Sequence, residues 1–80
     1  MEKLGLIAGN GRFPFLLLDA ARAHGLRVVV AAIKEETDAE MDARAAADPD
    51  VRVHWLSLGE LSRLIETFKA EGVKRAVMAG

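Results

Sequence analysis

The stretch Lys3-Leu-Gly-Leu-Ile-Ala-Gly-Asn-Gly-Arg-Phe-Pro14 decides the fold of this chain. Its first half is a short apolar run that stops at Gly9-Asn10-Gly11, a pattern typical of a buried strand entering a tight turn. Pro14 suits the first turn of a helix, because the N–H that proline lacks is not needed there. The stretch therefore predicts a strand over 3–8, a glycine turn, and a helix that continues to Gly25.

The next segments repeat this alternation. Val28, Val29 and Val30 stand in succession, which predicts within 26–33 a strand covered on both faces. Asp38 is the expected cap of a short alanine-rich helix over 39–47. Alternating valines then predict a third strand over 51–55.

The last third of the chain adds one helix and one strand. Ser57-x-x-Glu60 is a capping box, and it opens a helix that ends at Gly72. An apolar stripe on this helix is assigned to the core, together with Trp55. The stripe consists of Leu58, Leu61, Leu64, Ile65 and Phe68. A fourth strand is expected over 73–78.

The order β-α-β-α-β-α-β predicts an α/β fold with a single domain over 1–80. Right-handed crossovers allow one economical arrangement, a small Rossmann-like open parallel sheet of about four strands in the order 3-2-1-4. In that order the first and fourth strands are neighbours, and the point where the strand order reverses lies beyond their carboxyl ends.

Composition excludes several classes of function. The 80 residues carry 11 Lys+Arg and 12 Asp+Glu, a net charge of −1, so nucleic acid is not an expected partner. There is no Cys, so thiolate catalysis and Cys-ligated zinc are excluded, and a reducing compartment, by default the cytoplasm, is expected. The longest run without Asp, Glu, Lys or Arg is too short for a transmembrane segment.

Two glycine-bearing segments are expected to meet where the strand order reverses. One is Gly9-Asn10-Gly11-Arg12, and the other is Ala79-Gly80. Glycines let a ligand approach the backbone, and the positive end of the following helix dipole favours phosphate. The segment lacks the third glycine of the dinucleotide fingerprint, so a phosphate site and a merely structural turn both remain open.

Other polar residues point less clearly to chemistry. Glu35, Glu36, Thr37 and Asp38 follow the second strand, where they can hold a cation or a ribose, or form a solvated loop and a helix cap. His24 fits a helix end, and His54 has no nucleophile near it in sequence. We predict no catalytic residue and no metal ligand within these 80 residues.

The segment Gly5–Pro14 resembles the start of the LpxI-type UDP-2,3-diacylglucosamine pyrophosphatases of bacterial lipid A biosynthesis. Further matches follow in the order of that family, and the resemblance spans essentially the whole chain. They are Ala21-Arg22 with Gly25, Val28-Val29-Val30-Ala31, Glu36-Thr37, Trp55, Leu58-Gly59-x-Leu61, Phe68-Lys69 and Val77-Met78-Ala79-Gly80.

The resemblance implies the N-terminal domain of a cytoplasmic hydrolase at or near the inner membrane. This hydrolase uses a divalent metal, taken as magnesium, to cleave a UDP-linked acylated sugar into UMP and 2,3-diacylglucosamine 1-phosphate. Metal-holding carboxylates are expected in a C-terminal domain that this chain does not include, so the 80 residues alone are expected to be inactive.

By the same resemblance, six residues would contact substrate: Gly9, Asn10, Gly11, Arg12, Thr37 and Gly80. Two other interpretations stay open. The chain can be a non-catalytic nucleotide- or phosphate-binding module, or an interaction domain that forms a homodimer through an uncovered sheet edge or helix face.

Overall fold

The structure is a computed structural model that describes residues 2–80. Four strands alternate with three α-helices, and a short 3-10 helix, η1, precedes the last of these. In chain order the elements are β1 (Lys3–Ala8), α1 (Phe13–Ala23), β2 (Arg27–Ile33), α2 (Glu40–Ala47), β3 (Val51–Leu56), η1 (Leu58–Glu60), α3 (Leu61–Ala70) and β4 (Arg75–Ala79).

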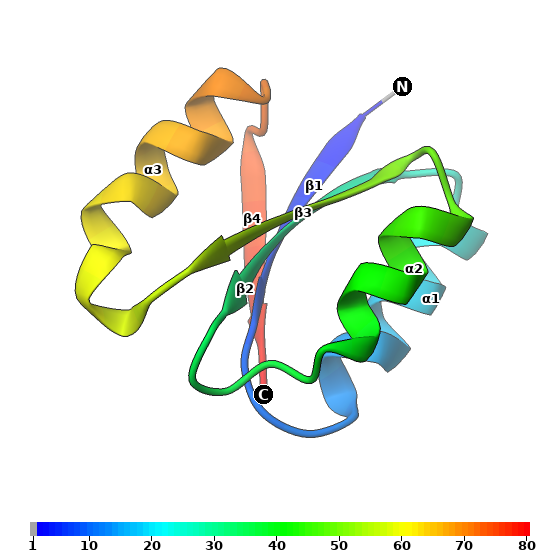
Figure 1. The fold of residues 1–80 in the computed structure, drawn as a ribbon. Helices are drawn as coiled ribbons and strands as arrows, with labels where there is room; N and C mark the ends of the chain where they lie inside the picture. The colour runs from blue at the N-terminus through cyan, green and yellow to red at the C-terminus, as the bar shows by residue number, and fades with distance from the viewer. Residues whose placement is uncertain (1) are drawn as a thin grey trace.

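All strand pairs are parallel, and the spatial order is β3-β2-β1-β4. Helices α1 and α2 cover one face of the sheet, and α3 lies alone on the other face (Figure 1). This arrangement confirms the predicted α/β fold and strand order. It also places the carboxyl ends of β1 and β4 side by side.

The core is unequal on the two faces. Under α1 and α2, side chains such as Leu6, Phe15, Leu18 and Met41 are buried together with the inward residues of β2. Under α3 the buried cluster is smaller and consists of Val29, Ala31, Leu56 and Phe68. Six of the seven residues of β2 are buried, as predicted for a strand covered on both faces.

The apolar stripe assigned to α3 is only partly core, so that prediction was wrong for three of its members. Phe68 is buried and Leu64 packs against the small cluster, but Leu58, Leu61 and Ile65 are exposed. The capping box is present, but it opens η1 instead of α3. Leu58 lies in the tighter 3-10 turn, so it is out of phase with the apolar face of α3. Leu61 and Ile65 lie on α3 but face beyond the strands that this helix covers, so the sheet does not bury them.

Helix α2 begins at Glu40, one residue later than predicted, and its N-cap is Ala39 instead of Asp38. The Asp38 carboxylate lies just before the helix and accepts a hydrogen bond from the Glu40 N–H at 2.8 Å. Met41 is the buried residue of this helix. No helix within residues 2–80 has the length and apolar character to span a bilayer.

Candidate ligand-binding rim at the carboxyl edge of the sheet

The two glycine-bearing segments meet at backbone distance. The Gly9 N–H donates a hydrogen bond to the Ala79 carbonyl oxygen at 2.7 Å. A Cβ on Gly9 would lie 2.9 Å from the Gly80 carbonyl oxygen, and a Cβ on Gly80 would lie 2.8 Å from the Asn10 nitrogen. Two glycines are therefore required here because two backbones touch, whether or not a ligand binds.

These segments, Gly9–Arg12 and Ala79–Gly80, form a rim beyond the carboxyl ends of β1 and β4. Gly11 has a different role at this rim. Its φ of 82° lies in the left-handed region, and a Cβ there would meet no atom within 4 Å. The chain thus turns at Gly11 and enters α1, and no protein atom occupies the space next to the Gly11 Cα. Within residues 2–80, the N–H groups of Asn10, Gly11 and Arg12 donate no backbone hydrogen bond. This rim presents free donors where the positive end of the α1 dipole emerges.

Arg12 is held at the rim by Glu40, a residue that sequence reasoning did not select. Two guanidinium nitrogens donate to the two Glu40 carboxylate oxygens at 2.8 and 3.2 Å. The guanidinium lies over the Phe15 ring, 4.4 Å from its centroid. The paired hydrogen bond raises the pKa of Arg12 and lowers the pKa of Glu40, so both stay charged. Arg12 also keeps N–H donors beyond the two that Glu40 accepts.

Thr37 lies at the inner side of the rim and is buried. Its hydroxyl donates to the Ala8 carbonyl oxygen at 2.6 Å and accepts from the Ile33 N–H at 2.8 Å. One side chain thus connects the carboxyl ends of β1 and β2. The hydroxyl thus fixes the end of β1 directly before the glycine turn begins at Gly9.

The acidic residues after β2 hold turns. Glu35 accepts hydrogen bonds from the Ser57 hydroxyl at 2.6 Å and from the Leu58 N–H at 3.1 Å. The Ser57 hydrogen bond is the main cause that lowers the pKa of Glu35. Glu35 thus holds the start of η1, whose N-cap is Ser57. This role of Glu35 was not predicted, since the Ser57 hydroxyl that it contacts is 22 residues away in sequence.

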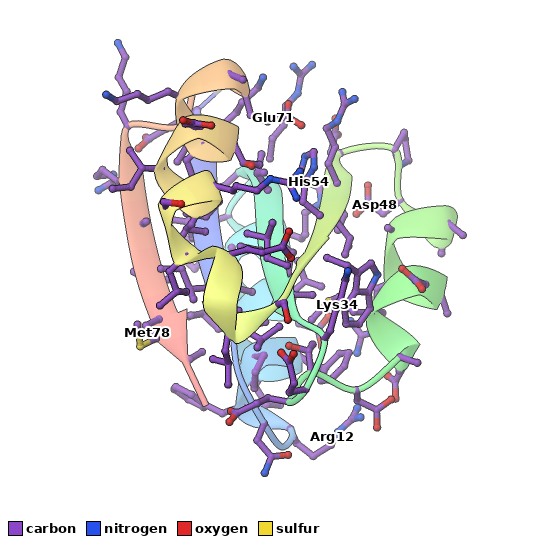
Figure 2. All side chains as sticks on the ribbon, turned by 60° about the vertical axis from the view of Figure 1, so that its left-hand side comes forward. Arg12, Lys34, Asp48, His54, Glu71 and Met78 are labelled. Atoms are coloured by element: carbon purple, nitrogen blue, oxygen red, sulfur yellow. The ribbon has the colours of Figure 1, made fainter. Side chains whose placement is uncertain are left out.

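The histidines lie away from this rim. His54 contacts the Glu71 carboxylate at 2.7 Å, and Arg52 contacts the same oxygen at 3.2 Å, so these groups cluster toward the other end of the sheet, opposite Arg12 (Figure 2). His24 contacts the Ala20 carbonyl oxygen at 2.8 Å at the end of α1. Two hollows, of about 320 and 210 Å³, share Lys3 as a lining residue and also lie at the amino ends of the strands.

A divalent metal ion would need several carboxylate or imidazole ligands close together. Between residues 2 and 80 there is no group of three or more His, Asp or Glu side chains placed to hold a metal. The carboxylates of Glu40, Glu35 and Asp38 at the rim are engaged instead with Arg12, Ser57 and a backbone N–H group. The residues present therefore do not fit a divalent-metal site.

Comparison with known proteins gives two matches. A family model described as the LpxI N-terminal domain matches residues 3–80. A curated protein of Caulobacter vibrioides, the UDP-2,3-diacylglucosamine pyrophosphatase LpxI, is 31% identical over 80 residues. The alignment covers 100% of this chain and 26% of that protein, so the chain spans about a quarter of the length of this relative.

Proposed function

This chain belongs to the LpxI N-terminal domain family, and from that premise we propose that it is the substrate-contacting domain of a UDP-2,3-diacylglucosamine pyrophosphatase of lipid A biosynthesis. In the proposed reaction, water attacks one phosphorus of the diphosphate, and the bridging oxygen leaves with the other phosphate. The products are UMP and 2,3-diacylglucosamine 1-phosphate. The full protein is proposed to work in the cytoplasm, next to the membrane that holds its acylated substrate.

One observation carries the assignment of the site. The segments after β1 and β4 meet where the strand order reverses, and the N–H groups of Asn10, Gly11 and Arg12, which donate no backbone hydrogen bond, belong to the segment after β1. Ligands of open parallel sheets bind at this position. Free backbone donors, a helix dipole and a fixed guanidinium are together suited to an anionic diphosphate.

Each proposed contact has its own task. The N–H groups of Asn10 and Gly11 bind phosphate oxygens, and Gly11 leaves the space that lets them approach. Arg12 compensates phosphate charge through the donors that Glu40 does not use. Gly9 and Gly80 allow the two segments to approach each other closely. Thr37 is a positioning residue that fixes the end of β1 beside the rim.

We assign the metal-holding carboxylates and the attacking water to the part of the full protein outside this segment. The rim residues do not fit the divalent ion, magnesium by resemblance, that the family implies. The 80-residue chain is accordingly proposed to bind the nucleotide diphosphate weakly and without turnover.

Backbone amide NMR of the 80-residue chain tests this function. On titration with UMP and a UDP-sugar, with and without magnesium, we expect shifts confined to 9–12 and Gly80. Arg12→Ala should weaken binding by about fivefold to tenfold, because one charge-assisted phosphate contact contributes on the order of 1 kcal/mol at an exposed site.

Arg63→Ala is the matched control. Arg63 is as exposed as Arg12, at 62% against 61% of its side chain, and is likewise paired with a glutamate, but it lies on α3. Loss of this arginine should leave the affinity unchanged. Equal effects of the two substitutions, or no shifts at millimolar ligand with wild type, would contradict a nucleotide site at this rim.

A further inference from the structure

Arg12 and Glu40 stand at the starts of two helices that begin at the same edge of the sheet. Arg12 is the N-cap residue of α1, directly after the glycine turn, and Glu40 is the first residue of α2. Both helices cover the same face of the sheet (Figure 1). Two guanidinium nitrogens meet two carboxylate oxygens, and this paired contact fixes the orientation of the Arg12 plane as well as its position.

The Glu40 carboxylate is shared between two arginines. Its Oε2 atom accepts from Arg12 at 3.2 Å and lies 3.6 Å from the Nε of Arg44, one turn further along α2. Arg44 in turn donates to the Asp19 carboxylate on α1. The Asp19 hydrogen bond raises the pKa of Arg44, and the nearby charge of Arg12 opposes this rise. The contacts thus form a row of alternating charges that starts and ends on α1.

Phe15 is a common support for both arginines. Its ring is buried, and the guanidinium carbons of Arg12 and Arg44 lie 4.4 and 5.4 Å from its centroid. An aromatic ring attracts cations to its face, but two cations that gather at one ring repel each other. Glu40 contacts both cations, so its negative charge compensates this repulsion and allows Arg12 to stay beside the ring.

The Arg12 contact differs from an ordinary exposed ion pair. Most exposed pairs contribute little, and the exceptions are bidentate arginine pairs and networks of several charges. The pair of Arg12 and Glu40 is bidentate and belongs to a network. The ion pair of Arg63 and Glu60 on the other face of the sheet rests on one hydrogen bond of 2.7 Å between neighbouring turns. The same chain thus offers a held arginine and a loosely held one.

We propose that Glu40, supported by Arg44, is a positioning residue that holds the Arg12 guanidinium in place for the diphosphate at the rim. This inference rests on the proposed function, because the diphosphate is the ligand proposed there. Glu40 accepts from two of the five N–H donors of Arg12, so the pair stays intact while phosphate oxygens accept from the others. A guanidinium that is already fixed loses less conformational entropy on binding than a free side chain does.

The direction of one mutational effect separates positioning from simple electrostatics. A carboxylate beside the rim repels an anionic ligand, so Glu40→Gln would tighten binding if Glu40 acted through its charge alone. A positioning role predicts the opposite, because glutamine offers one oxygen where the carboxylate offers two. UDP-glucose is the probe, since it carries the diphosphate. We expect Glu40→Gln to weaken its binding by about threefold, which is less than the loss expected for Arg12→Ala.

A double-mutant cycle isolates the contact between the two side chains. When Arg12 is replaced by alanine, Glu40 has no rim guanidinium to hold, and only its repulsion of the ligand remains. Glu40→Gln should therefore leave the affinity of the Arg12→Ala chain unchanged or raise it. Glu66→Gln removes the same charge from an exposed position on α3 and should leave the affinity of the wild type unchanged. Equal or tighter binding by Glu40→Gln alone, or the same loss in both backgrounds, would overturn the positioning role.

A measurement without ligand separates this inference from the nucleotide site itself. NMR relaxation of the arginine Nε–H groups reports how firmly each guanidinium is held on the fast timescale. We expect Arg12 to be more ordered than Arg63 in the free chain, and Glu40→Gln to reduce the order of Arg12 to that of Arg63. An ordered Arg12 that Glu40→Gln releases, in a chain that binds no UDP-glucose, would support the Glu40 contact and contradict the proposed function. An Arg12 as mobile as Arg63, or one that stays ordered in Glu40→Gln, would overturn the role of Glu40.

Discussion

At the scale of single residues, the rim depends on side chains that support the backbone and are not proposed to touch the ligand. The Thr37 hydroxyl serves one donor and one acceptor of the backbone, and both of these belong to strands that end at the rim. Thr37→Val keeps the shape of the side chain but leaves the Ile33 N–H and the Ala8 carbonyl unpaired in a buried place. We expect a loss of about 2–4 kcal/mol in the free energy of unfolding.

Urea denaturation measures this loss, and two variants make the result specific. Thr37→Ser keeps the hydroxyl and should recover most of the stability. Thr67→Val makes the same chemical change at a half-buried position on α3 and should change stability by less than about 1 kcal/mol. A Thr37→Val protein as stable as wild type would show that its hydrogen bonds are dispensable.

The rim residues that could be predicted from sequence are those that follow the ends of the strands. Gly9, Gly11 and Gly80 are visible as glycines at strand ends, but the contact between Gly9 and Gly80 needs the strand order as well. Glu40 could not be selected, since its partner Arg12 is 28 residues away and charged residues are common on helix surfaces. The pair could have been proposed only from the predicted topology, because Arg12 and Glu40 both stand at the starts of helices that begin at the same edge of the sheet.

At the scale of elements, local periodicity located the helices and strands but misjudged one buried face. The stripe on α3 has the spacing of a core-facing helix, and only Leu64 and Phe68 pack toward the sheet. The spacing of apolar residues indicates which of them share one side of a helix. Whether they are buried depends on how much of the sheet lies under that side. Since β4 lies beyond the reach of α3, the flank with Leu61 and Ile65 is left exposed.

The joint between β1 and β4 gives a prediction at this scale. Gly9→Ala would bring a Cβ to 2.9 Å from a backbone oxygen of Gly80, and backbone atoms cannot rotate away. The ends of the two strands must then separate, with an expected loss of about 1–3 kcal/mol in stability. Gly59→Ala is the control, because a Cβ there meets no atom within 4 Å and Gly59 has no positive φ.

Amide hydrogen exchange locates the effect of Gly9→Ala. The amides of 76–80 should exchange faster than in wild type, while those of β2 and β3 should keep their protection, because the disturbance is confined to one strand pair. Uniform acceleration across the sheet would indicate global destabilisation instead of a separated joint. Unchanged exchange at 76–80 would contradict the tight backbone contact.

At the scale of the whole molecule, topology was the most predictable property. Parallel strands, short connections and right-handed crossovers leave few arrangements for four strands and three helices. Surface electrostatics were less predictable, since ion pairs such as Arg22 with Asp48 join elements that are distant in sequence. This pair connects the end of α1 to the turn before β3, and Arg22 reaches Asp50 in the same turn.

The ion pairs and hydrogen bonds of four carboxyl groups make stability depend on pH in a definite direction. The Arg22 hydrogen bond lowers the pKa of Asp48, the Arg12 hydrogen bond lowers that of Glu40, and hydrogen bonds from Ser57 lower those of Glu35 and Glu60. A carboxyl group with a lower pKa in the folded state contributes stability above its unfolded pKa. That contribution is lost as the pH falls through the folded pKa.

We therefore expect the free energy of unfolding to be constant near pH 7 and to decline below about pH 4, where unfolded carboxyl groups bind protons. Asp48→Asn should lower stability at pH 7 and lower it less at pH 3, so the variant's pH profile is flatter than that of wild type. Urea denaturation at the two pH values measures the difference. Glu66→Gln, an exposed position on α3, removes one charge as a control and should keep the wild-type slope. Parallel profiles for wild type and Asp48→Asn would mean that Asp48 is equally acidic in both states, and that its contact with Arg22 does not stabilise the fold.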